Sequence, residues 1–72
     1  MQTFYFHLNL SAQEIINYYQ GNATSLSVVT NEGLRIEFPL LHLRRFVGIN
    51  GVKGYFCLTS ENNKFVSLEK IN

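Results

Sequence analysis

The sequence predicts an α+β fold in which one short α-helix packs on a curved, mainly antiparallel five-stranded sheet. Apolar and polar residues alternate in five separate segments, the two-residue period of a strand with one buried face. Only the segment that follows residue 11 has the spacing of an amphipathic helix. Short turns join four of the strands in pairs, which makes those pairs antiparallel.

The 72 residues are expected to form a single domain, 1–72, because a chain of this length is too short for two. The expected order is β-α-β-β-β-β, with a short helical turn after the third strand. One helix can cover only one face of the sheet. The other face is then solvated, meets a partner, or curls onto itself as a small, partly open barrel.

The first strand is expected over residues 3–10, and a capping box predicts the start of the helix at Ser11, with Glu14 three residues further on. Gly21 is expected to end the helix in the left-handed conformation. An isolated helix of about ten residues is marginal in water, so this one is expected to lie on the sheet. Its predicted apolar face consists of Ala12, Ile15, Ile16 and Tyr19.

Two hairpins account for the remaining strands. The first joins residues 24–30 to 34–38 through a three-residue turn, in which Gly33 supplies a positive φ. Pro39 ends the returning strand, and residues 40–47 are expected to form a short helical turn. The second hairpin joins residues 52–59 to 64–71. A simple register turns Val66 and Leu68 inward and leaves Phe65 on the outer face.

Composition and charge narrow the class of protein. The chain is 46% hydrophobic with a net charge of +1, which indicates a globular protein without a global attraction to nucleic acid. Cys57 is the only cysteine, so no internal disulfide can form, and a cytoplasmic location is expected. No run approaches the roughly 20 apolar residues of a membrane span, and no leader peptide is expected.

No catalytic or metal-binding motif is evident. The single conceivable nucleophile–base pair is Cys57 with His7 or His42, and a strand cysteine is usually a small packing residue. The chain has no aspartate, its glutamates are scattered, and the two histidines lack metal-ligand spacing. We therefore expect a protein that is not an enzyme and needs neither a cofactor nor a metal.

Binding to a macromolecule is the remaining class of function. Residues 35–53 carry four basic side chains against one glutamate. The outer strand faces also hold several apolar groups, and exposed apolar patches usually mark interfaces. The predicted binding residues are Arg35, His42, Arg44, Arg45, Lys53 and Tyr55. Three of them, Arg35, Lys53 and Tyr55, are expected to share one surface with Tyr5.

Four stretches of the chain also resemble a known family. They are Gly33–Pro39, His42–Arg44, Gly54–Thr59 and Asn62–Glu69. Together with Tyr18–Gly21 they resemble, over essentially the full length, a bacterial family of small proteins known as domain of unknown function 2835. The resemblance implies a proteobacterial, cytoplasmic protein, and it supplies no activity.

The predicted function is therefore that of a non-enzymatic protein-interaction or adaptor module that contacts another protein or a second copy of itself. The alternative is a small nucleic-acid-binding protein that uses the same basic and aromatic residues to hold a backbone and stack bases. No membrane contact is expected, because the one helix has Glu14 as its only charge and no basic face.

Overall fold

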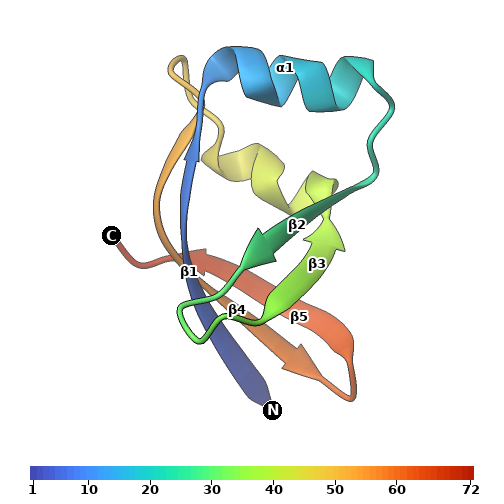
Figure 1. Ribbon diagram of the computed structural model, residues 1–72, viewed down its shortest axis with the longest axis vertical. Coiled ribbons are helices and arrows are strands. Elements are labelled where there is room, and N and C mark those ends of the chain that lie inside the picture. Colours follow the sequence, from blue (N-terminus) through green and yellow to red (C-terminus); the bar gives the residue numbers. More distant parts are fainter.

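A computed structural model describes residues 1–72 and confirms an α+β chain with two short helices (Figure 1). The predicted order of elements is present, and the helical turn after the third strand is a 3-10 helix, η1. In chain order the elements are β1 (Gln2–Leu10), α1 (Ala12–Gln20), β2 (Ser25–Val29), β3 (Arg35–Pro39), η1 (Leu40–Phe46), β4 (Val52–Glu61) and β5 (Lys64–Lys70).

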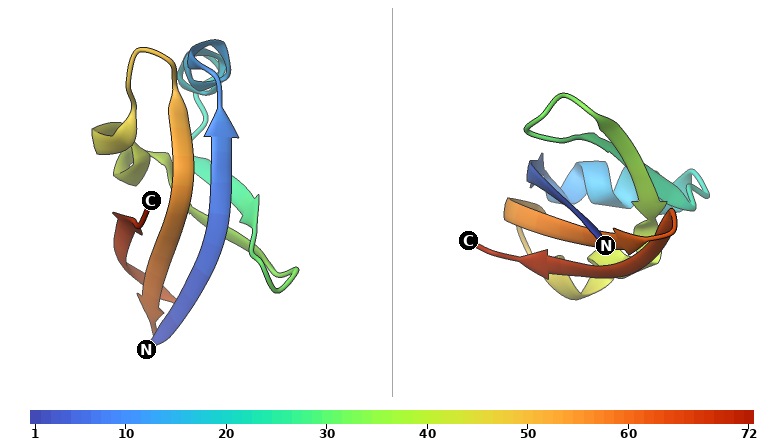
Figure 2. Two further views of the ribbon diagram at one scale, coloured as in Figure 1. Left: turned by 90° about the vertical axis from the view of Figure 1, so that its left-hand side faces the viewer. Right: turned by 90° about the horizontal axis from the view of Figure 1, so that it is seen from below.

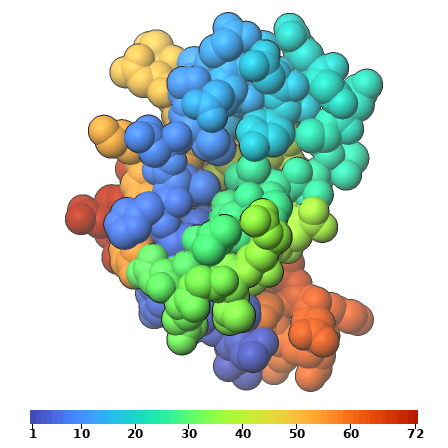
Figure 3. Space-filling view, viewed as in Figure 1, coloured from blue at the N-terminus to red at the C-terminus, as the bar shows by residue number.

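The strands form two antiparallel sheets, so the prediction of one five-stranded sheet is wrong. One sheet has the order β1-β4-β5 and the other is the β2–β3 hairpin. The hairpin faces the larger sheet and does not extend it, because Phe38 packs on Phe6 with ring centroids 5.9 Å apart. A backbone bond from Asn31 N–H to the Tyr5 carbonyl (2.9 Å) joins the turn of the hairpin to β1, and the two segments meet at the surface in Figure 3.

The core lies between the inner face of the three-stranded sheet, the hairpin and η1. Phe6 is fully buried at its centre and contacts Phe56 as well as Phe38, at 6.1 Å from the Phe56 ring. Phe46 of η1 meets Phe56 edge-on at 5.2 Å. The buried apolar residues are Phe6, Leu8, Ile15, Leu26, Val28, Phe38, Leu40, Leu43, Val52, Phe56, Leu58 and Leu68.

Helix α1 begins as the capping box predicts. The Glu14 N–H donates to Ser11 Oγ at 3.1 Å, and the Ser11 N–H donates to Glu14 Oε1 at 3.3 Å. Its other end differs from the prediction, because Gly21 has a φ of −80° and Asn22 takes the left-handed conformation with a φ of 61°. The Ala23 N–H bonds to the Tyr18 carbonyl and the Asn22 N–H to that of Tyr19, so the helix ends in a Schellman motif with asparagine at its left-handed position.

Helix α1 lies across one end of the core (top of Figure 1). The prediction that it lies on the face of the sheet is therefore wrong. The hairpin and η1 already cover the inner face of the sheet, so the end is the place left for it. Ile15 is buried and Tyr18 packs against the core, whereas Ile16 and Tyr19 of the predicted apolar face are exposed. The buried face of the helix therefore follows a spacing of three residues.

The β4–β5 hairpin contains a register shift between Thr59 and Ser60. Thr59 faces Ser67, while Ser60 faces Phe65, so the β5 residue between them is left without a partner. This bulge reverses the predicted faces at the start of β5. Phe65 packs against the core, and Val66 is exposed. A bulge moves side chains to the opposite face of a strand, which is why regular alternation fails here.

Candidate functional site

The six predicted binding residues lie in three regions of the molecule. His42, Arg44 and Arg45 belong to η1; Lys53 and Tyr55 belong to β4; Arg35 begins β3. Figure 2 (left) shows η1 and β5 on one side of the molecule and the β2–β3 turn on the other.

The shared surface predicted for Tyr5, Arg35, Lys53 and Tyr55 is therefore only partly present. Lys53 and Tyr55 face outward from the three-stranded sheet together with residues of β1. Arg35 lies in the other sheet, where its guanidinium donates to Ser27 Oγ at 3.3 Å. The predicted basic residues therefore come from η1 and from both sheets, and not from one sheet face.

An open groove of about 610 Å³ runs between η1 and β5, and we call it the η1–β5 groove. It collects His42, Arg44 and Arg45 from the predicted set. Leu41 (63% exposed) and Val66 (46% exposed) are its most exposed apolar side chains. Its lining consists of Leu41, His42, Arg44, Arg45 and residues 65–69.

The aromatic part of the groove is the stack of His42 on Phe65. Their ring centroids are 3.8 Å apart, the rings are 10° from parallel, and both residues are half-buried. The 3-10 helix places His42 here because Leu40 and Leu43, three residues apart, are buried beneath it. Sequence reasoning missed Phe65 because a regular register turns it to the opposite face.

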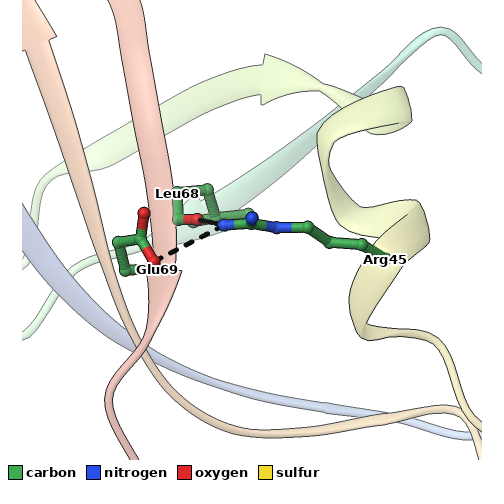
Figure 4. A network of polar contacts seen from close by, with 3 residues as sticks. All are labelled: Arg45, Leu68 and Glu69. Atoms are coloured by element: carbon green, nitrogen blue, oxygen red, sulfur yellow. Dashed lines mark hydrogen bonds and ion pairs between the residues drawn. The ribbon is translucent and has the colours of Figure 1, made fainter.

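Arg45 reaches across the groove from η1 to β5 (Figure 4). Its Nη2 donates to the Leu68 carbonyl at 2.6 Å and lies 3.5 Å from Glu69 Oε2. The guanidinium carbon also lies 4.6 Å from the centre of the Phe46 ring, a cation–π contact. The pairing with Glu69 is solvent-exposed on both sides, so it contributes roughly 1 kcal/mol at most.

A second cluster, the aromatic face, lies on the outer side of β1 and β4. Tyr5 and Tyr55 stack with ring centroids 6.0 Å apart, and the centroid of the His7 ring lies 4.4 Å from that of Tyr55. The Tyr55 hydroxyl accepts a hydrogen bond from Asn31 Nδ2 at 2.7 Å. Strand alternation predicts the two tyrosines, but Asn31 comes from a turn in the other sheet, and no local pattern indicates it.

The candidates for catalysis and metal binding form no hydrogen-bonded pair: His7 and Cys57 are diagonal neighbours on the outer face of the β1–β4 ladder, and His42 is in another region. Cys57 is a free, half-buried thiol opposite Tyr5 in the β1–β4 ladder, and His42 lies in the η1–β5 groove. His7 contacts Tyr55 and makes no hydrogen bond to Cys57. No group of three or more His, Cys, Asp or Glu side chains is arranged to hold a metal ion. Neither helix has the length and apolar character needed to cross a bilayer.

Comparison with known proteins gives one match. The model of a family described as "protein of unknown function (DUF2835)" matches residues 2–71. Neither a curated protein nor a solved structure shows significant similarity. The family match covers nearly the whole chain, including the η1–β5 groove and the aromatic face, so this chain belongs to the DUF2835 family of proteins of unknown function.

Proposed function

We propose that this chain is a non-enzymatic protein-interaction module that holds a segment of a partner protein in the η1–β5 groove. The observation that carries the proposal is the composition of the groove. Exposed apolar side chains, a stacked aromatic pair and two arginines line one concave surface. Aromatic residues and arginine are the types most enriched where proteins bind one another.

The dimensions of the groove favour a short segment of the partner and a transient complex. The lining consists of nine residues, fewer than the roughly 20–30 that each side contributes to a stable interface. A partner that covers Leu41 and Val66 removes their apolar surface from water, which stabilises the complex by about 25 cal/mol per Å². These two side chains are therefore the apolar part of the proposed contact.

The experiment compares affinity capture by three forms of the protein. Leu41→Asp places a charge in the groove, and Leu34→Asp places the same charge on a leucine that is also exposed but lies outside it (63% and 51% exposed). Both leucines are on the surface, so both variants should fold. We expect the wild type and Leu34→Asp to retain the same proteins from a native extract and Leu41→Asp to lose them.

Nuclease treatment of the extract should leave that result unchanged. Proteins that disappear with nuclease, or that both variants lose equally, would contradict the proposal. The partner can also be a second copy of this chain. In that case sedimentation of the purified protein shows a mass that rises with concentration, and Leu41→Asp abolishes the rise.

Nucleic-acid binding is the second candidate, and the aromatic face is the observation that favours it. Tyr5 and Tyr55 offer rings on which bases can stack, with Lys53 on the same outer face of the sheet. A single nearby lysine gives only a small electrostatic contribution. Anisotropy of a labelled single-stranded oligonucleotide at low salt tests this function. Binding that Tyr55→Ala weakens would support it, and no binding by the wild type would exclude it.

We propose that the module works in the cytoplasm of a bacterium. Cys57 is its only cysteine and is a free thiol, and a small domain without disulfides suits a reducing compartment. Fractionation of cells that express the native gene, with antibody detection, tests the location. Recovery in the periplasmic fraction would contradict it.

A further inference from the structure

The guanidinium of Arg45 is held in place but uses little of its hydrogen-bonding capacity. The Phe46 ring and the Leu68 carbonyl position it, and Glu69 lies beside it. Both polar contacts are made by one nitrogen, Nη2, whereas a guanidinium has five N–H donors on three nitrogens. Nε and Nη1 make no hydrogen bond to the protein. The donors of Arg45 are therefore oriented before any ligand arrives.

The charges of the groove favour an anionic ligand. Arg44 and Arg45 face a single acidic side chain, that of Glu69. The side chain of Arg44 makes no hydrogen bond or ion pair, and the residue is exposed. The Glu69 carboxylate is 3.5 Å from Arg45 and exposed, so its hold on the guanidinium is weak.

We propose that Arg45 binds the carboxylate of an aspartate or glutamate in the partner segment and that Glu69 competes for the same guanidinium from within the chain. This inference rests on the proposed function of the groove. The partner's carboxylate takes the Nη2 hydrogen that faces Glu69 together with one adjacent free donor, on Nη1 or Nε, as a bidentate pair. Arg44 adds a second positive charge, and Leu41 and Val66 contact apolar residues that flank the acidic one.

Side chains, and not the main chain of β5, make this contact. Leu68 is 2% exposed and its carbonyl is occupied by Arg45, so the middle of the β5 edge is not free to pair with an added strand. A nucleic-acid backbone fits the groove less well than an acidic protein segment. A chain of repeated phosphates needs several basic side chains in a row, and Arg35 and Lys53 lie outside the groove.

The test is a titration of the ¹⁵N-labelled protein, followed by NMR, with a synthetic octapeptide of alternating leucine and glutamate. Its counterpart, with lysine in place of glutamate, is the control ligand. We expect the acidic peptide to shift the amide signals of residues 41–46 and 65–69 together with the Arg45 Nε–H signal. The basic peptide should leave them unchanged, and a thymidine octanucleotide should not displace the acidic peptide.

Two variants should change the affinity for the acidic peptide in opposite directions, and a third serves as the control. Arg45→Gln should weaken binding of the acidic peptide by about tenfold, the size of a lost charged hydrogen bond. Glu69→Gln should strengthen it by roughly threefold, because the internal competitor is gone and two positive charges remain. Lys53→Gln removes a positive charge outside the groove and should change the affinity by less than about twofold. Circular dichroism confirms that each variant is folded.

Several outcomes would overturn the inference. They are equal binding of both peptides, no shift with the acidic peptide, displacement by the oligonucleotide, or weaker binding by Glu69→Gln. The same experiments test the proposed function of the groove separately from the carboxylate contact. If Leu41→Asp still loses the captured partner while Arg45→Gln binds the peptide like the wild type, the groove docks proteins without a carboxylate anchor. If capture survives Leu41→Asp, the groove itself is not the docking site.

Discussion

The two ladders of the three-stranded sheet differ in regularity. The β1–β4 ladder pairs every residue of β1 in an unbroken register, and its alternation puts Phe6 in the core and Tyr5 on the surface. The β4–β5 ladder shifts register near its turn, where Phe65 turns inward and Val66 outward. The regular ladder builds the centre of the core, and the irregularity in the other ladder builds part of the candidate site beside it.

The bulge has a direct consequence for the groove. It brings Phe65 under η1, where the ring stacks on His42, and it leaves Val66 on the groove surface. Without the bulge, Phe65 lies on the outer face and the groove loses its aromatic part. Bulges are often found where a strand must redirect a side chain near a functional site.

The largest loss of stability is expected for a substitution in the regular β1–β4 ladder. Phe6→Ala removes a ring that contacts both Phe38 and Phe56, and it should lower the free energy of unfolding by about 3–5 kcal/mol. A chain of 72 residues has little stability to spare, so this variant should be largely unfolded. Its neighbour Tyr5 is on the surface, and Tyr5→Ala should cost about 1 kcal/mol. Urea unfolding measures both, and similar losses would contradict the predicted faces of β1.

A smaller effect tests the irregular ladder. Phe65→Ala should lower the free energy of unfolding by about 2 kcal/mol, because the half-buried ring packs on His42 and the core. Val66→Ala should cost about 0.5 kcal/mol or less, because its side chain is exposed. A simple register predicts the reverse order, so a greater loss for Val66→Ala in urea unfolding would refute the bulge.

The smallest effect concerns the polar link between η1 and β5. Glu69→Gln should change the free energy of unfolding by about 0.5 kcal/mol or less, because both partners of the ion pair are exposed. The difference from the wild type should shrink further as salt screens the charges. Thermal unfolding at low and high salt measures it. A loss of several kcal/mol would mean that Glu69 holds the fold together, which is incompatible with its role as a displaceable competitor.

Local patterns predicted the parts of the fold that local interactions determine. Alternation identified the buried side of β1 and β4, the capping box identified the start of α1, and the positive φ of Gly33 followed from its turn. The division into two sheets and the position of α1 escaped prediction. Both depend on the packing of Phe38 against Phe6, two residues that are 32 positions apart in the sequence.

The candidate site was predictable only in part, for the same reason. His42, Arg44 and Arg45 were identified from charge and position, and they do line one groove. Phe65 and Glu69 were missed because their contacts with η1 depend on the register of β5. Arg35 was grouped with the outer face of β4 because a single sheet was expected.

The contact between His42 and Phe65 is the most direct test of how the groove is built. Nuclear Overhauser spectroscopy of the labelled protein in solution measures which protons lie close to the His42 ring. The structure predicts strong cross-peaks from that ring to the ring protons of Phe65, and none from the Val66 methyl groups to those of Leu58, the buried β4 residue that an unbulged register would place diagonally opposite Val66. Cross-peaks from Val66 to Leu58, with none between His42 and Phe65, would show an unbulged strand and no groove of this composition.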